Sequence, residues 1–275
     1  MADCNHDCEH CASNCGERIS MPEKFFMNGN IKNVIGIVSG KGGVGKSLVT
    51  GLLASEINKK GLKTAILDAD ITGPSIPKMF GINEKVLSDG HFIQPAKSKN
   101  GTKIISMNLC LQNEGEPVVW RGPVLAGVVR QFYEEVDWAD VDFMFVDMPP
   151  GTGDVPLTVF QSLPVKGIII VTTPQDLVSM IVSKAINMAN IMNIPVLGIV
   201  ENMSYFDCPN CNTRHYIFGE SKLKEIAGAY EINATAQLPV MSSLADMCDN
   251  GNIEGFDGEK YLSEIINSSL LTPNS

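Results

Sequence analysis

The chain has 275 residues, 44% of them hydrophobic, and its 21 basic and 31 acidic side chains give a formal charge of −10. Such a chain can build one large domain, and its acidic balance argues against general binding to nucleic-acid phosphates or to an anionic membrane surface. It lacks the basic start and apolar core of a signal peptide and any apolar run near the ~20 residues of a membrane span, so we expect a soluble cytoplasmic protein.

Residues 1–20 are polar and carry four cysteines, which are Cys4, Cys8, Cys11 and Cys15. Because the cytosol keeps thiols reduced, cysteines at this density indicate metal or redox chemistry more than disulfides. The C-x3-C-x2-C-x3-C spacing can enclose one metal ion or iron–sulfur cluster, with His6 and His10 as competing ligands. We therefore predict a flexible tail at residues 1–20 that binds an iron–sulfur cluster or zinc, a linker at residues 21–30 and one folded domain at residues 31–275.

An apolar run at residues 33–39 leads into a glycine-rich loop, and residues 48–60 have the pattern of a helix. The loop fits G-x-x-x-x-G-K-[ST] and consists of Gly40, Lys41, Gly42, Gly43, Val44, Gly45, Lys46 and Ser47. In such a loop, backbone N–H groups face the phosphates, Lys46 supplies charge to the β/γ oxygens and Ser47 offers a hydroxyl to Mg²⁺. The sequence therefore predicts a nucleotide site at the N-terminus of the following helix.

Apolar runs typical of strands alternate with helical segments along the rest of the chain. The strand candidates are residues 63–67, 103–107, 142–146, 167–172 and 196–200, and the helix candidates include residues 123–136, 177–192 and 221–230. This alternation predicts an α/β fold with a mostly parallel, twisted sheet and helices on both faces. Residues 258–271 have the pattern of a further amphipathic helix, but Lys260 is its only basic residue, which weakens a membrane-anchor interpretation.

Acidic residues follow two of the strand candidates, at the edge where ligands bind in open α/β sheets. Asp68 and Asp70 come after residues 63–67, and Asp147 comes after residues 142–146. An apolar strand that ends in Asp beside a phosphate-binding loop has the Walker B arrangement, in which the carboxylate binds Mg²⁺ directly or through water. The alternative role for each acid is that of a helix N-cap. For Asp154, which lies further along the same segment, we weigh the N-cap role and a functional role equally.

Cys208 and Cys211 form a CxxC pair in a polar loop after the last strand candidate. Two thiolates at this spacing can hold one metal centre from one side. Tetrahedral zinc and a four-iron cluster both prefer four protein ligands, and a two-fold homodimer would supply the missing two by symmetry. The residues alone leave open a zinc ion bound by Cys208, Cys211, His215 and a fourth ligand from elsewhere.

Two further cysteines, Cys110 and Cys248, are isolated in the sequence. A buried, unreactive thiol is the expected role of each.

The segment GKGGVGKS at residues 40–47 resembles the deviant Walker A loop of the Min/ParA, nitrogenase iron-protein and Mrp ATPases. In that group the lysine that matches Lys41 reaches the nucleotide of the partner subunit. The segments DADITGPS, VDMPPGTGD and VENMSYFDCPNC resemble the switch I, Walker B/switch II and base-recognition segments of the Mrp/ApbC family, whose members are iron–sulfur cluster carrier ATPases. The resemblance extends from about residue 31 to about residue 255.

The resemblance implies roles for residues around the nucleotide. It implies that Asp70 positions the attacking water, that Asp68 supports the Mg²⁺ shell and that Asp147 is the Walker B acid. It also implies that Gly151 and Asp154 sense the γ-phosphate. Asn202 and the segment around Pro239 would bind adenine.

The resemblance also implies the activity and the partners. A [4Fe-4S] cluster would be bridged by Cys208 and Cys211 of two subunits, received from cluster-assembly scaffolds and transferred to apo-proteins, with slow ATP hydrolysis as a conformational switch. Eukaryotic scaffold members carry an N-terminal cysteine group with wider spacing and many bacterial members have none, so the role of the tail stays open.

Two other classes of ATPase share features of this sequence. A Min/ParA-type positioning ATPase has the same loop but not the cysteines, and a reductase like the nitrogenase iron protein bridges a cluster with two widely separated cysteines from each subunit. The CxxC pair, the acidic balance and the lack of a basic tail helix favour the cluster carrier.

Overall fold

The computed structural model of the chain describes residues 29–70, 75–86, 92–106, 109, 122–175 and 178–268. The expected metal-binding tail lies outside these residues with its cysteines Cys4, Cys8, Cys11 and Cys15, and so does Cys110. None of the described helices is long and apolar enough to cross a lipid bilayer.

A single large sheet runs through the described domain. Its strands, in spatial order, are β10 (Thr235–Gln237), β7 (Val196–Glu201), β6 (Gly167–Thr172), β1 (Ile31–Val38), β5 (Val141–Asp147), β2 (Thr64–Asp68), β4 (Lys103–Ser106) and β3 (Ala96–Lys97). The edge strand β3 is antiparallel to β4, whereas the other neighbours pair in parallel. Parallel neighbours need a crossover, and β6, for example, reaches β7 through a helix.

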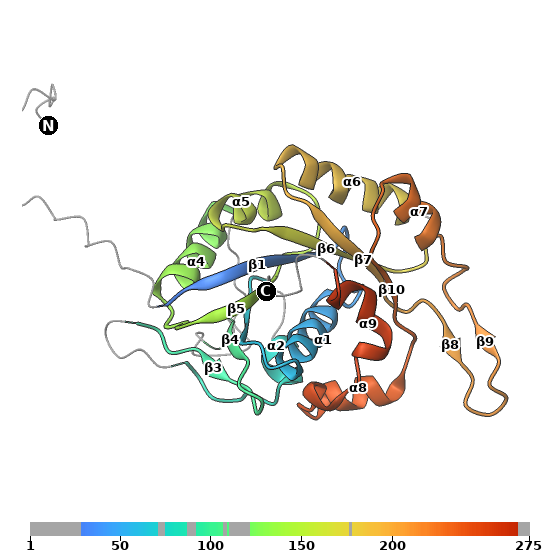
Figure 1. The fold of residues 1–275 in the computed structure, drawn as a ribbon, viewed down its shortest axis with the longest axis horizontal. Coiled ribbons are helices and arrows are strands. Elements are labelled where there is room, and N and C mark those ends of the chain that lie inside the picture. The colour runs from blue at the N-terminus through green and yellow to red at the C-terminus, as the bar shows by residue number, and fades with distance from the viewer. Residues whose placement is uncertain are drawn as a thin grey trace, which may run out of the picture.

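Helices cover both faces of the sheet (Figure 1). One face carries α4 (Gly122–Glu135), α5 (Asp154–Ser162), α6 (Val178–Ile191) and α7 (Leu223–Ala229). The other carries α1 (Lys46–Lys59), α2 (Ser75–Met79), α8 (Ser242–Asp249), α9 (Glu259–Ile266) and the 3₁₀ turn η1 (Ile253–Gly255). The sheet is therefore enclosed between two apolar cores.

Strand β5 shows why both faces are sealed. Phe143 and Phe145 belong to the core shared with α1, whereas Met144 and Val146 belong to the core shared with α4 and α5. A slip of one residue would exchange these two sets of side chains, so burial on both faces fixes the register. The carboxyl ends of the strands are held at fixed positions as a result.

The α/β architecture expected from the alternation of apolar runs is confirmed, and every strand candidate is present within a few residues of its predicted ends. The helix expected at residues 258–271 is present as α9, which ends at Ile266. Periodicity did not reveal β3, β10 or the short helices α2, α5 and α8, because segments of so few residues show too little of a repeat.

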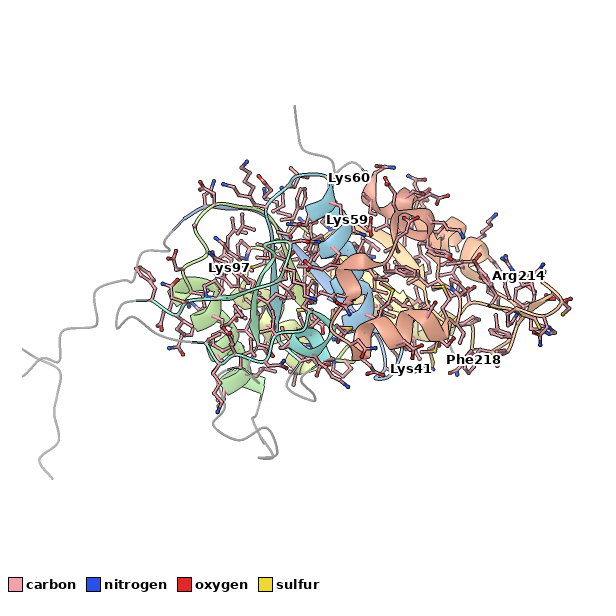
Figure 2. The ribbon with its side chains drawn as sticks, turned by 90° about the horizontal axis from the view of Figure 1, so that it is seen from below. Lys41, Lys59, Lys60, Lys97, Arg214 and Phe218 are labelled. Carbon is pink, nitrogen blue, oxygen red and sulfur yellow. The ribbon has the colours of Figure 1, made fainter. Side chains whose placement is uncertain are left out.

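A separate hairpin projects from the domain after the carboxyl end of β7 (Figure 1). It consists of β8 (Phe206–Asp207) and β9 (Arg214–His215), which pair in antiparallel fashion. Figure 2 places Arg214 in this projecting part, at one end of the molecule, and Lys97 near the other end. The turn of the hairpin contains the CxxC pair, which is therefore carried away from the two cores.

Candidate functional site

The phosphate loop and the acidic residues meet because three neighbouring strands end at the same edge of the sheet. In the register of the parallel strands, Asp147 of β5 lies beside Asp68 of β2 on one side and beside Ile37 of β1 on the other. The glycine-rich loop follows β1, so the strands bring its Lys46 and Ser47 against Asp147.

Gly45 shapes the end of the loop and the start of α1. It has a φ of 83°, in the left-handed region, and occupies the N-cap position of the helix. An added Cβ would lie 2.1 Å from the side-chain nitrogen of Asn202, which donates a hydrogen bond of 3.0 Å to the Val44 carbonyl oxygen. Glycine is therefore required for both backbone conformation and space. The free N–H groups of the first turn of α1 are left facing the place expected for phosphates.

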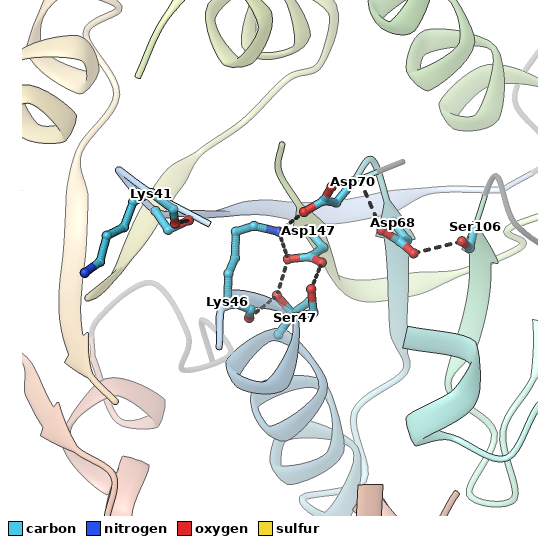
Figure 3. Close-up of polar contacts among 9 residues, drawn as sticks. Lys41, Lys46, Ser47, Asp68, Asp70, Ser106 and Asp147 are labelled. Carbon is cyan, nitrogen blue, oxygen red and sulfur yellow. Dashed lines mark hydrogen bonds and ion pairs between the residues drawn. The ribbon is translucent and has the colours of Figure 1, made fainter. Parts of the chain in front are cut away.

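Lys46 is the buried cation of the site (Figure 3). Its Nζ lies 2.7 Å from Asp147 Oδ1 and 3.2 Å from Asp70 Oδ2. Burial alone would lower the pKa of Lys46, but the two carboxylates outweigh that effect and raise the pKa above its usual value. The ammonium group is therefore charged and is held by the two carboxylates.

The two acids at the strand ends, Asp68 and Asp147, also accept hydrogen bonds from hydroxyl groups. Asp147 also accepts hydrogen bonds from the hydroxyls of Ser47 and Thr50, and Asp68 accepts one of 2.8 Å from Ser106. Burial, the largest cause, raises the pKa of Asp147 and raises that of Asp68 well above its usual value. Neither Thr50 nor Ser106 was predicted from the sequence, where nothing distinguishes them from other hydroxyl residues.

The charge balance at this edge suits a divalent cation. Two carboxylates, those of Asp70 and Asp147, lie within ion-pair distance of the single ammonium of Lys46, which leaves an excess of negative charge. Within the described residues, no group of three or more His, Cys, Asp or Glu is arranged to hold a metal ion unaided. Mg²⁺ fits such a place, since proteins bind it through one or two carboxylates together with substrate phosphates.

A cavity of about 400 Å³ opens above this cluster of charges. The loop lines one side of it with Gly42, Gly43, Gly45, Lys46 and Ser47, and Asp70 lines another. Its size and its mixture of N–H donors, ammonium and hydroxyl suit a chain of phosphates.

Lys41 does not take part in this cavity. Figure 3 shows its side chain extending away from Lys46 and the acids, and its Nζ donates to the side-chain oxygen of Gln175, in the segment after β6. Gln175 was not predicted as a site residue, because no sequence pattern links it to the loop. Within one chain, then, Lys46 faces the cavity and Lys41 faces the surface beside Gln175.

The other expected nucleotide contacts lie around the same edge. Gly151 has a φ of 105° and donates its N–H to the Ser39 carbonyl oxygen at 2.8 Å. Gly153 holds the N-cap position of α5, so Asp154 begins the helix rather than capping it. Pro239 is buried, and the residues on either side of it bond through their N–H groups to the segment at residues 201–205.

The CxxC pair occupies the turn of the β8–β9 hairpin. Cys211 is exposed and Cys208 is partly exposed, and both thiols are free. The Cys208 N–H donates to the Thr213 carbonyl oxygen at 3.0 Å, and Cys211 Sγ lies 3.3 Å from Thr213 Oγ1. Hydrogen bonding by Thr213 lowers the pKa of Cys211, which favours the thiolate, the form that binds metal.

His215 does not join the two thiols. It is opposite Phe206 in the hairpin, and its ring lies tilted against the Phe206 ring at a centroid distance of 6.5 Å. In the part of the chain that the structure describes, no three-residue metal group forms around the CxxC pair. Cys248 is partly buried in α8, and burial raises the pKa of its thiol.

These features define a class of protein. A glycine-rich loop between a buried strand and a helix, with its lysine and serine bonded to the Asp that ends a neighbouring strand, is the site of a P-loop nucleoside triphosphatase.

Comparison with known proteins identifies the family. A family model described as ParA, NUBPL iron-transfer P-loop NTPase, matches residues 30–268. The iron–sulfur cluster carrier protein of Clostridium perfringens is 45% identical over 272 residues, which cover 96% of this chain and 95% of that protein. The chain belongs to the family of NUBPL iron-transfer P-loop NTPases.

Solved structures agree with this assignment. A nucleotide-binding protein from Archaeoglobus fulgidus in complex with ADP is 44% identical, with a TM-score of 0.74 over 82% of this chain and 88% of that one. The cell-division ATPase MinD of Pyrococcus furiosus has a TM-score of 0.61 at 18% identity, over 86% of this chain and 97% of its own, and shares the fold.

Replacement of Lys46 by alanine should lower nucleotide affinity by at least about tenfold, because a charge-assisted contact of ~1.5–3 kcal/mol is removed. Equilibrium titration with a fluorescent ATP analogue measures this change. The matched control is Lys97→Ala on the exposed edge strand β3, which should bind as the wild type does. Since Lys46→Ala leaves Asp147 without its ammonium partner, a thermal melt should accompany the titration. Unchanged affinity in a folded Lys46→Ala protein would mean that the phosphates bind elsewhere.

Proposed function

We propose that this chain is an iron–sulfur cluster carrier, in which two copies bind a [4Fe-4S] cluster through Cys208 and Cys211 and transfer it to apo-proteins, with ATP as the switch. The observation that carries the proposal is a pair of accessible thiols in a projecting hairpin of a P-loop triphosphatase. The family and the name of the Clostridium relative support the same cargo. Cluster-assembly scaffolds would load the carrier, and the cytoplasm, where thiols are kept reduced, would suit its work.

The number of ligands leads to the dimer. A four-iron cluster takes four cysteine ligands, and Cys208 and Cys211 supply two. A two-fold axis through the cluster brings the same pair from a second copy, so that binding the cluster and forming the dimer are linked. A cluster shared between subunits can be released when they separate, which suits a cargo.

The surface beside the hairpin supports such a dimer. Tyr216, Ile217 and Phe218 follow β9 with 47%, 59% and 37% of their surfaces exposed, and exposed apolar groups that lie together are typical of interaction surfaces. The next residue, Gly219, lies close to the segment after β6, since an added Cβ on it would be 3.2 Å from the Pro174 carbonyl oxygen. Gln175, which follows Pro174, contacts Lys41, so the strip continues towards Lys41. Figure 2 shows Lys41 and Phe218 along the same edge of the molecule. We infer that Lys41 serves the nucleotide of the partner subunit.

The phosphate loop and the strand-end acids would bind and hydrolyse ATP. Lys46 and the loop N–H groups would hold the phosphates, and Ser47 and Asp147 would hold Mg²⁺, which would neutralise charge on the β- and γ-phosphates. Asp70 lines the cavity and contacts Lys46, where its carboxylate can accept a hydrogen bond from the water that attacks the γ-phosphorus as the bond to ADP breaks. Asp68, bonded to Ser106 and to the Asp70 N–H, keeps Asp70 in place.

The remaining nucleotide contacts would report which nucleotide is bound. Gly151 lies in the loop after β5 and Asp154 is the first residue of α5, and we assign both to sensing the γ-phosphate. We assign Asn202 and the segment around Pro239 to adenine. ATP can act as a switch only if the dimer has two arrangements that bind ATP with different affinities. The two arrangements must also bind the cluster with different affinities.

If Lys41 acts across the dimer, subunits with Lys41→Ala and subunits with Asp70→Ala should complement each other. A mixed dimer has one complete site, in which Asp70 of one subunit works with Lys41 of the other. Since half of the dimers in a random mixture are mixed, the mixture should recover about a quarter of the wild-type rate of ATP hydrolysis. Each variant alone should be nearly inactive while still binding nucleotide, as the titration above would verify. A mixture no more active than either variant alone would refute the assignment of Lys41 to the partner's nucleotide.

Cys208→Ala or Cys211→Ala should abolish cluster transfer to an apo-acceptor and reduce bound iron to what the tail can hold, with ATP binding preserved. Deletion of residues 1–20 should remove iron bound by the tail but leave about one four-iron cluster per dimer. Iron and sulfide analysis of anaerobically prepared protein, together with a transfer assay, measures both effects. Cys248→Ala is the matched control and should change neither. If the deletion abolishes transfer and the CxxC variants do not, the tail is the working site.

A further inference from the structure

A short stretch of chain joins the phosphate loop to the two thiols. Strand β7 ends at Glu201, and the next residue, Asn202, donates its side-chain amide to the Val44 carbonyl oxygen within the loop at 3.0 Å. Cys208 follows six residues later. If the loop moves when it binds a nucleotide, the bond from Asn202 therefore passes that movement to the base of the hairpin.

Met203 lies in the turn at the start of this stretch. Its φ of 55° lies in the left-handed region, which is unfavourable for a side chain of this kind. It borders the phosphate cavity, and hydrogen bonds hold the backbone on both sides of it, from the Asn202 N–H to the Thr172 carbonyl oxygen and from the Ser204 N–H to the Leu238 carbonyl oxygen. A strained turn held in this way is suited to respond when the cavity fills.

Beyond the turn, three side chains form a clamp at the base of the hairpin: Tyr205, Asp207 and Arg214. Arg214 donates from Nε and Nη2 to the two carboxylate oxygens of Asp207, at 2.8 and 2.9 Å, and its guanidinium carbon lies 3.6 Å from the centroid of the Tyr205 ring. The Tyr205 carbonyl oxygen accepts a hydrogen bond of 2.7 Å from the Val240 N–H. The clamp thus ties both hairpin strands to the segment expected to cover adenine.

Stability does not account for this arrangement. The side chains of Asp207 and Arg214 are 51% and 47% exposed, and an exposed ion pair adds little to the free energy of folding. A two-pronged contact combined with ring stacking fixes orientation as well as distance, which a lysine at the same position could not do. The geometry therefore serves to set the angle of the hairpin relative to the domain.

We propose that this clamp transmits nucleotide occupancy of the phosphate loop to the orientation of Cys208 and Cys211, with Arg214 as the positioning residue. Its consequence for cluster transfer rests on the proposed function, since a hairpin orientation that differs between the ATP-bound and ATP-free states gives the cluster different affinities. The coupling itself exists in the protein without a cluster, so it can be measured separately.

Hydrogen–deuterium exchange of the full-length protein, with and without a non-hydrolysable ATP analogue, tests the coupling at the amides of residues 206–215. In the wild type, the analogue should change exchange in this hairpin by at least about fivefold. Arg214→Lys keeps the positive charge but loses the two-pronged contact with Asp207 and the stacking on Tyr205. This variant should bind the analogue as tightly as the wild type, but the analogue should no longer change exchange in the hairpin. The matched control is Arg130→Lys, in the exposed Arg130–Glu134 pair of α4, which should respond as the wild type does.

The double variant with Asp207→Arg and Arg214→Asp restores the ion pair with its ends exchanged, and it should regain part of the response. In the transfer assay, Arg214→Lys protein should load iron normally but transfer it at the same rate with and without ATP. Two results would overturn the inference: a full exchange response in Arg214→Lys, or a wild-type hairpin that does not respond. If the hairpin responds as expected but transfer survives Cys208→Ala and Cys211→Ala, the coupling stands and the proposed function is wrong.

Discussion

The contact between Lys46 and Asp147 is the interaction on which the site depends, because it joins the start of α1 to the end of β5 inside the protein. Loss of one partner of a buried pair leaves an uncompensated charge and typically costs about 3–5 kcal/mol. The same Asp147 bonds the hydroxyls of Ser47 and Thr50, so the first turn of α1 is held against the sheet. With that turn in place, the loop keeps its shape and Asn202 can bond to it, which ties β7 and the hairpin beyond it to the phosphate site.

The sequence was sufficient to predict the fold and the convergence of the loop with its acids. Alternating apolar runs imply parallel strands, parallel strands end at one edge, and Asp68 and Asp147 follow two of those runs. The sequence was not sufficient to predict hydrogen-bond partners that are far apart in the chain and are brought together by packing. Ser106 bonds to Asp68 across 38 positions, and Gln175 bonds to Lys41 across 134, and no local pattern marks either residue. Such pairs arise from the arrangement of whole elements, which a single sequence does not display.

The hairpin illustrates the same limit at short range. Its CxxC motif was evident, but its strands have two residues each, too few to show the alternation that marks a strand. The sequence therefore did not single out Arg214, which pairs with Asp207 and stacks on Tyr205. The consequence is that the thiols are not on a loose loop. They stand on a short hairpin that is braced by the Asp207–Arg214 pair and follows directly on the contact between Asn202 and the phosphate loop.

The central claim is that Cys208 and Cys211 of two copies share one cluster. Native mass spectrometry tests it most directly on the full chain with Cys4, Cys8, Cys11 and Cys15 all replaced by serine, reconstituted with iron and sulfide without oxygen. The claim predicts dimers that carry one four-iron cluster and revert to cluster-free monomers when the iron is chelated. Monomers that retain a cluster, or cluster-bearing dimers that persist after Cys208→Ala and Cys211→Ala are introduced, would contradict it.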